Sequence, residues 1–462
     1  MKNEFNKVYI FGITLVATIG GLLFGYDTAV ISGAEKSIQA YLIEPLGLGA
    51  FAHGATVSSA LIGCIIGGFL SGTLSSRLGR KKSLLLAAIL FFLSALGSGF
   101  PETLFFTEGE PSMALLWTFN FYRVIGGIGV GLASAVCPMY IGEIAPAQIR
   151  GRLVSFNQFA IIFGMLVVYF VNWGIANGQT LEWINAIGWR YMFASEAIPA
   201  ALFATLLLLV PETPRYLALT HQDDKAMAVL EKINGSKERA SSILNEIKGT
   251  VSGDVKAKLF SYGKKVIVIG ILLSVFQQFV GINVALYYAP RIFESMGAAK
   301  DASMLQTIIM GLVNVIFTVV AIMTVDKWGR KPLLITGSIG MAIGMFAISG
   351  LAFNNIIGIS TLVFIIIYTA SFMMSWGPIC WVLIAEIFPN KIRGQAVAIA
   401  VAAQWFSNYL ISSTYPPMME FSGGMTYAFY GLMAVLSALF VWKMIPETKG
   451  KTLEDMEKLW KK

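Results

Sequence analysis

Residues 142–151 read GEIAPAQIRG and residues 385–394 read AEIFPNKIRG, with a glutamate and an arginine seven positions apart in both copies. Two further pairs of motifs occur in the same order: RLGRKK and KWGRKP at residues 77–82 and 327–332, and PETPR and PETKG at residues 211–215 and 446–450. Each second copy follows the first by 235 to 250 residues. Three ordered pairs at similar offsets indicate that the chain consists of two related halves.

The sequence outside these motifs is strongly apolar. Of the 462 residues, 56% are hydrophobic and 13% are charged, whereas soluble domains usually carry about 25% charged residues. This composition predicts a polytopic membrane protein. Because the alternating pattern of a lipid-facing barrel is absent, the spans are expected to be helices.

Apolar windows predict twelve membrane-spanning helices, six in each half. They cover residues 8–31, 54–76, 83–100, 115–140, 153–174, 191–210, 264–289, 303–325, 332–352, 358–385, 394–414 and 425–444. The polar stretch between the two sets has apolar residues at helical spacing, which favours short amphipathic helices. The predicted units are therefore an N-terminal six-helix half (1–213), a helical cytoplasmic linker (214–263), a C-terminal six-helix half (264–445) and a cytoplasmic tail (446–462).

The distribution of charge predicts the orientation. Short loops on one side of the predicted spans hold eleven Lys and Arg residues, and those on the other side hold four. The positive-inside rule therefore places both termini and the linker in the cytoplasm. The same clustering explains the net charge of +8 without a nucleic-acid partner. The three cysteines and two histidines are isolated along the chain, so no metal site is expected.

The motifs resemble those of the major facilitator superfamily and, within it, the sugar porter family. The resemblance rests on the duplicated elements above and on QQFVGIN at residues 277–283. GGLLFGYDTAVISG at 20–33 and SWGPICWVLIAEIFPN at 375–390 extend it to bacterial D-xylose/proton symporters. It implies the major facilitator fold with a small cytoplasmic helical bundle, located in the cell inner membrane, and proton-coupled monosaccharide uptake. No cofactor and no obligatory protein partner are implied.

The duplicated cytoplasmic motifs contain both acids and bases. Because positive-inside sorting requires no acids, we interpret these residues as ion pairs that latch the cytoplasmic side and break when it opens. The predicted latch residues are Arg80, Glu143, Arg150, Arg330, Glu386 and Arg393. Topogenic charge alone is the alternative. Ser76 stands where the superfamily motif has aspartate, which weakens any latch that depends on that carboxylate.

Three ionisable residues lie inside predicted spans of the N-terminal half: Asp27, Arg123 and Glu196. Such groups are costly in a membrane and usually face a pathway or a partner. Asp27 with Arg123 forms a plausible ion pair, and protonation of Asp27 would weaken it. The resemblance assigns proton coupling to Asp27, with Arg123 and Glu196 around it. An inert structural ion pair is the alternative.

Neutral amides and indoles in the spans predict a sugar site, because a sugar needs uncharged donors and acceptors with flat apolar faces. The candidates, each at a position that sugar porters use, are Gln158, Gln277, Gln278, Asn283, Asn314, Trp381, Gln404, Trp405 and Asn408. Gly281 is expected to bend its span so that Gln278 and Asn283 are both presented. Interhelical hydrogen bonding and plain packing are the alternative readings of single members.

Two further pairs of residues bear on gating and selectivity. Tyr287 and Tyr288 follow the predicted bend and are candidates for an outer gate. Met165 stands on the same helix face as Gln158, where xylose symporters typically carry a second glutamine. Leu286 keeps the xylose-type residue. D-Xylose is therefore the best guess, and glucose, galactose and arabinose stay open.

Three other functions are weighed against symport. Passive uniporters of this fold generally lack a carboxylate at the position of Asp27, which disfavours that reading. Sugar sensors usually carry long signalling tails, and short polar ends are expected here. No nucleophile–base pair or metal cluster is seen in the spans, which argues against an enzyme.

Overall fold

The computed structural model is almost entirely helical, and it describes residues 5–105, 110–146, 148–251, 259–295, 297, 299–356, 358–389, 392–449 and 460. Within these residues, eleven helical segments are long and apolar enough to cross a membrane. The remaining predicted span is a helix of 29 residues whose polar side chains lower its hydropathy. All twelve predicted spans therefore coincide with helices.

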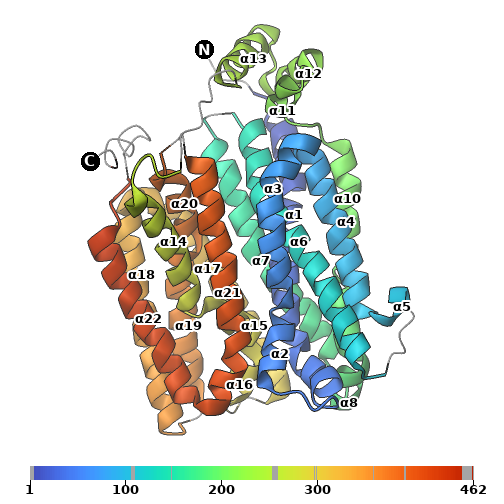
Figure 1. Cartoon of the computed structure of the whole chain (residues 1–462), viewed down its shortest axis with the longest axis vertical. Helices are drawn as coiled ribbons and strands as arrows, with labels where there is room; N and C mark the ends of the chain where they lie inside the picture. The colour runs from blue at the N-terminus through green and yellow to red at the C-terminus, as the bar shows by residue number, and fades with distance from the viewer. Residues whose placement is uncertain are drawn as a thin grey trace.

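The membrane helices form two groups that stand side by side (Figure 1). The N-terminal group contains α1 (Lys7–Ile38), α2 (Ala50–Val57) with α3 (Ser59–Leu78), α4 (Arg80–Gly99), α6 (Met113–Ile144), α7 (Arg150–Ala176), and α9 (Trp189–Ala194) with α10 (Ala197–Leu209). The C-terminal group contains α14 (Lys264–Phe279) with α15 (Ile282–Tyr287), α17 (Lys300–Trp328), α18 (Arg330–Phe353), α19 (Ile359–Met373) with α20 (Trp376–Ile387), α21 (Arg393–Phe421) and α22 (Gly423–Met444). The groups meet where α7 packs on α17 and where α2 and α3 pack on α21.

Three short helices cover one end of the bundle (Figure 1). They are α11 (Pro214–Leu219), α12 (Asp223–Asn234) and α13 (Lys237–Val251). Ala226, Leu230 and Ile233 of α12 are buried, as their helical spacing predicts. The predicted linker is thus helical, whereas its residues 252–258 and most of the predicted tail lie outside the described residues. The opposite end carries the short helices α5 (Glu102–Phe105), α8 (Leu181–Trp183) and α16 (Ala289–Ser295).

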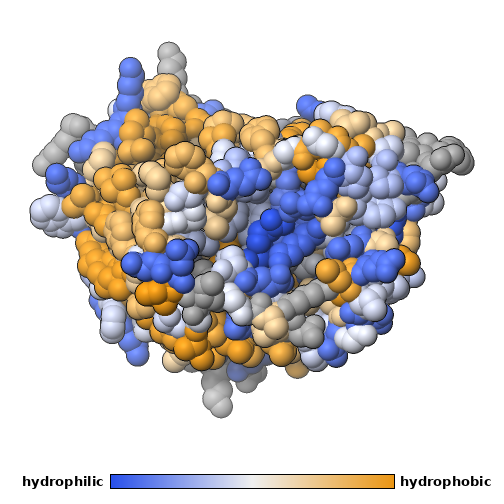
Figure 2. Space-filling model, turned by 90° about the horizontal axis from the view of Figure 1, so that it is seen from below, coloured by the Kyte–Doolittle hydropathy of each residue, from blue (hydrophilic) through white to orange (hydrophobic). Residues whose placement is uncertain are grey.

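Large apolar side chains remain exposed on the outer faces of the bundle, such as Leu15, Trp117 and Leu209. Aqueous proteins rarely expose apolar surface on this scale, but lipid tails accept it. Seen from the α8 and α16 end, orange apolar residues surround a blue polar band that crosses the middle of the face (Figure 2). The fold is therefore that of a multi-pass membrane protein.

The predicted bend between α14 and α15 is present. Gly281 has φ +90°, a left-handed conformation that a side chain disfavours. A Cβ atom there would lie 2.8 Å from the ring of Tyr430. The carbonyl of Val280, left free by the break, accepts a 2.7 Å hydrogen bond from the Tyr368 hydroxyl. Both the backbone conformation and the packing therefore require glycine.

Replacing Gly281 with alanine is expected to lower stability by about 1–3 kcal/mol, because it adds backbone strain and a clash at once. Thermal unfolding in detergent would measure the effect. Gly174→Ala is a matched control, since nothing lies within 4 Å of a Cβ atom at that membrane-helix position. Equal unfolding temperatures for the two variants would contradict this account of the bend.

Candidate functional site

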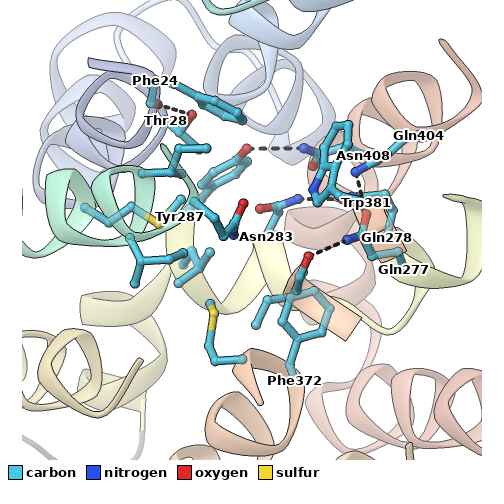
Figure 3. Close-up of a pocket in the computed structure, with 18 of the residues that line it drawn as sticks. Phe24, Thr28, Gln277, Gln278, Asn283, Tyr287, Phe372, Trp381, Gln404 and Asn408 are labelled. Carbon is cyan, nitrogen blue, oxygen red and sulfur yellow. Dashed lines mark hydrogen bonds between the residues drawn. The ribbon is translucent and has the colours of Figure 1, made fainter. Parts of the chain in front are cut away.

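A cavity lies between the two halves at the level of the α14–α15 break. It contains about 610 Å³ of space between atoms, including the part open to solvent. The N-terminal half contributes residues of α1 and α7, and the C-terminal half contributes residues of α14, α15, α19, α20 and α21. The lining side chains converge on this space (Figure 3).

The polar side of the cavity is a connected set of amides centred on Gln277. Its Oε1 accepts hydrogen bonds from Gln278 Nε2, at 3.2 Å, and from Gln404 Nε2. Its own Nε2 donates to the carbonyl oxygen of Trp376 at 3.0 Å, where α20 begins after a break in the span. Asn283 Nδ2 donates to Gln278 Oε1 at 2.5 Å. The amides of three helix segments are thus held in one orientation (Figure 3).

Some polar atoms of this site have no partner within the described protein. Gln404 Oε1 and Trp405 Nε1 are buried without a hydrogen bond. One is an acceptor and the other a donor, and buried groups of this kind are costly unless they are satisfied. The Trp405 ring lies 5.7 Å from that of Phe24, so an aromatic pair joins the two halves beside these atoms. This combination suits a neutral polyol with apolar C–H faces.

Most of the predicted sugar-site residues line this cavity. They are Gln158, Met165, Gln277, Gln278, Asn283, Leu286, Tyr287, Trp381, Gln404, Trp405 and Asn408. Asn314, on α17, is buried but is not among the lining residues. Tyr288 lies away from the cavity and donates to the carbonyl of Ser412 at 3.2 Å.

Sequence reasoning missed the apolar side of the cavity. It is formed by Phe24, Ile161, Ile162, Ile282, Phe372 and Met373, together with the hydroxyl-bearing Thr28. Phe24 and Thr28 lie four residues apart on one face of α1, in the segment that contains Asp27. That spacing was a usable signal, whereas Phe372 and Met373 look like any other apolar residues of a span.

The three predicted proton-site residues are brought together inside the N-terminal half. Arg123 Nη1 donates to Asp27 Oδ1 at 2.6 Å, and both side chains are at most 2% exposed. Glu196 stands at the break between α9 and α10 and interacts electrostatically with both. Neither of its oxygens accepts a hydrogen bond from a described group. One guanidinium therefore faces two buried carboxylates, and a single bound proton would balance the charge.

A second, smaller cavity joins this charged cluster to the amide-lined cavity. Asp27 and Arg123 line it, and Thr28 and Tyr287 line both cavities. Asn408 Nδ2 donates to the Tyr287 hydroxyl at 3.3 Å, which connects the amides to this shared wall. A change at Asp27 can therefore reach the larger cavity through one layer of side chains.

The duplicated motifs that carry the predicted latch residues form two equivalent clusters, one in each half. Arg80 Nη2 donates to Glu143 Oε1 at 2.8 Å, and Arg330 Nη2 donates to Glu386 Oε1 at 2.9 Å. Arg150, expected to pair with Glu143, instead donates to the carbonyl of Ala145 at 3.5 Å. In the second half Arg393 donates to the carbonyl of Phe388 at 3.1 Å. These ion pairs join helices within one half rather than across the halves.

The glutamates of the two PET motifs complete these clusters. This role was not predicted from the sequence. Glu212 accepts the backbone N–H groups of Arg80 and Lys81, each at 3.1 Å. Glu447 accepts those of Arg330 and Lys331, at 3.0 and 2.9 Å. Each carboxylate thus caps a helix N-terminus, where negative charge is favourable. The repetition of PET in register with GRK was the available signal.

Comparison with known proteins agrees with this architecture. A family model described as sugar (and other) transporter matches residues 13–460. The D-xylose-proton symporter of Escherichia coli (strain K12) is 54% identical, over 100% of this chain and 97% of the relative. The arabinose-proton symporter of Bacillus subtilis (strain 168) is 41% identical, over 98% of this chain and 95% of the relative.

Solved structures show the same similarity. The inward-open conformation of the xylose transporter from E. coli has a TM-score of 0.89 and 54% identity, covering 98% of this chain and all of that one. The proton:xylose symporter bound to 6-bromo-6-deoxy-D-glucose has a TM-score of 0.84 and 53% identity, covering 99% and 100%. The predicted fold and family are confirmed. The chain belongs to the sugar transporter family of the major facilitator superfamily, whose members are transporters rather than enzymes.

Proposed function

We propose that this protein couples the uptake of a monosaccharide, D-xylose as the first choice, to the entry of a proton. The observation that carries the proposal is the contact between two sites. The smaller cavity, which the buried Asp27–Arg123 pair lines, shares Thr28 and Tyr287 with the amide-lined cavity. The relative with 54% identity, named as a D-xylose-proton symporter, supports the same substrate and the same coupling.

The two halves divide the work in this proposal. A proton on Asp27 removes its negative charge and weakens its hold on Arg123, so the N-terminal half is freed to move. Amides of the C-terminal half hold most of the sugar, and this half then closes against α1 and α7 of the N-terminal half. The halves then rock around the cavity and expose it first to one side and then to the other. The cytoplasmic clusters keep the helix ends of each half together during this motion, and contacts between the clusters close that side in the outward-open state.

The excess of basic residues in the loops at the α11–α13 end supports a cytoplasmic location for both termini. The α8 and α16 end then faces outward, in the inner membrane of a bacterial cell. Labelling of an added cysteine at Gln179 or Lys443 with a membrane-impermeant reagent in intact cells tests this. Only the first position is expected to react.

The test of function is uptake by proteoliposomes across a panel of labelled sugars, with and without an inward proton gradient. We expect the preferred sugar to accumulate only with the gradient. Accumulation that ignores the gradient would favour a uniporter, and equal uptake of all sugars would contradict a selective site. Glucose and arabinose belong in the panel because relatives named for transport of each are 41–42% identical to this chain.

Met165 provides a test of selectivity, since it lines the cavity on the same face of α7 as Gln158. Met165→Gln adds a donor and an acceptor beside the proposed sugar. It is expected to shift the xylose-to-glucose preference by roughly tenfold, the value of one net hydrogen bond. Competition uptake measures the ratio. Met165→Leu is the matched control, and identical preference in the two variants would remove the significance of this position.

A further inference from the structure

Charged residues join the two halves at the α8 and α16 end of the molecule. Arg291 of α16 donates from Nε to Glu35 Oε1 at 2.9 Å and from Nη2 to Glu35 Oε2 at 2.7 Å, so the pair is bidentate. Lys36, the next residue of α1, forms an ion pair with Glu294 of α16. Both pairs cross from the N-terminal half to the C-terminal half.

Glu35 depends on this contact because its side chain is fully buried. Besides Arg291 it has His53 of α2, whose Nε2 lies 3.2 Å from Glu35 Oε2. Arg291 also donates to Gln39 Oε1, four residues after Glu35 and directly beyond the end of α1. A buried carboxylate that loses its cation is strongly unfavourable until water reaches it. The contact between the two halves at this end is therefore stabilised by Arg291.

The order of the charges allows one register. Along α1 an acid precedes a base, and along α16 the base Arg291 precedes the acid Glu294. Sliding α16 along α1 would bring like charges together, which disfavours alternative packings. The Lys36–Glu294 pair is partly exposed, at 37% and 26%, so it can separate into water without leaving a buried charge.

Two solved xylose transporter structures that are named as inward open match this chain with TM-scores of 0.88 and 0.89. With the orientation proposed above, an inward-open carrier is closed at the α8 and α16 end. The two cross-half ion pairs form at that end.

We propose that Glu35, Lys36, Arg291 and Glu294 form an outer latch that stabilises the inward-facing state and sets its ratio to the outward-facing state. The inference rests on the alternating access of the proposed function. Its four residues lie outside both cavities. They act on the resting equilibrium of the carrier and need neither sugar nor proton gradient to do so.

The test measures the distance between spin labels on cysteines introduced at Gln179 and Glu420, two exposed positions on opposite halves of this end. The three buried native cysteines are first replaced by alanine. Distances are recorded by double electron–electron resonance in the purified full-length protein without sugar. Lys36→Glu places two carboxylates opposite each other and is expected to raise the longer-distance population roughly tenfold, within the usual range of coupling between states.

The charge-swapped double variant, Lys36→Glu with Glu294→Lys, is expected to restore the wild-type distribution. Glu182→Lys is the matched control, a charge reversal on an exposed residue of α8 within one half, and should change nothing. A second variant, Arg291→Gln, should lengthen the distance as well. An unchanged distribution in both Lys36→Glu and Arg291→Gln would overturn the latch, and so would failure of the double swap to restore the distances.

These outcomes are separate from the proposed function. If the latch hypothesis is wrong, gradient-driven uptake is still expected. If the protein does not couple sugar to protons, the spin labels still report whether this end opens.

Discussion

Replacing Asp27 with asparagine is expected to abolish uphill accumulation of sugar while exchange of sugar across the membrane stays measurable. Asparagine keeps an oxygen that can accept from Arg123 but cannot take up a proton. A proton driven by about 100 mV supplies about 2.3 kcal/mol, which corresponds to roughly 50-fold accumulation. Without coupling, the accumulation ratio should fall to about one. Uptake under an imposed gradient and counterflow without one measure the two quantities.

Asp223→Asn makes the same chemical change in α12, one of the three short helices at one end of the bundle, and should leave both measurements unaltered. Loss of counterflow together with accumulation in Asp27→Asn would instead assign Asp27 a structural role. Glu196→Gln distinguishes the two carboxylates further, since it leaves Asp27 with a guanidinium that no longer faces a second acid. We expect it to change the pH dependence of uptake more than the maximal rate.

Gln277→Leu is expected to weaken sugar binding on the order of hundredfold. The variant removes the acceptor of Gln278 and Gln404 and the donor to the Trp376 carbonyl in one step. Each buried polar group left without a partner costs about 1–3 kcal/mol, and tenfold in affinity corresponds to about 1.4 kcal/mol. Titration calorimetry with the transported sugar gives the change directly.

Gln395→Leu, at an exposed position on α21, is the matched control and should bind sugar like the wild type. Thermal unfolding must show that Gln277→Leu is folded before its affinity is interpreted. A folded variant whose affinity lies within threefold of the wild type would show that the amide cluster serves helix packing rather than sugar.

The sequence predicted the helices and the bend because their causes are local. Apolar stretches of sufficient length identify the spans without knowledge of their neighbours. The hydropathy signal is weakest for α21, because Gln404, Asn408 and neighbouring serines lower its hydropathy. Gln404 and Asn408 also line the cavity, so the weakest apolar signal among the predicted spans marks a functional helix.

The site was only partly predictable. Amides within spans pointed to the Gln277 cluster, because polar side chains in a membrane helix need partners. The same rule included Asn314, which is buried on α17 but is not among the residues that line the cavity. A polar residue in a span signals a partner, but its direction depends on how the helix is rotated in the bundle.

The sequence by itself determined the two repeated halves, the membrane helices, the break at Gly281 and the residue types that suit a sugar and a proton. The tertiary structure decided which of these residues meet. It placed Asp27 beside Arg123 and Glu196, and it joined α1 to α16 through Glu35 and Arg291. The physical reason is range: hydropathy and backbone conformation act over a few residues, whereas ion pairs and cavities depend on the packing of helices about 100 to 250 residues apart in the chain.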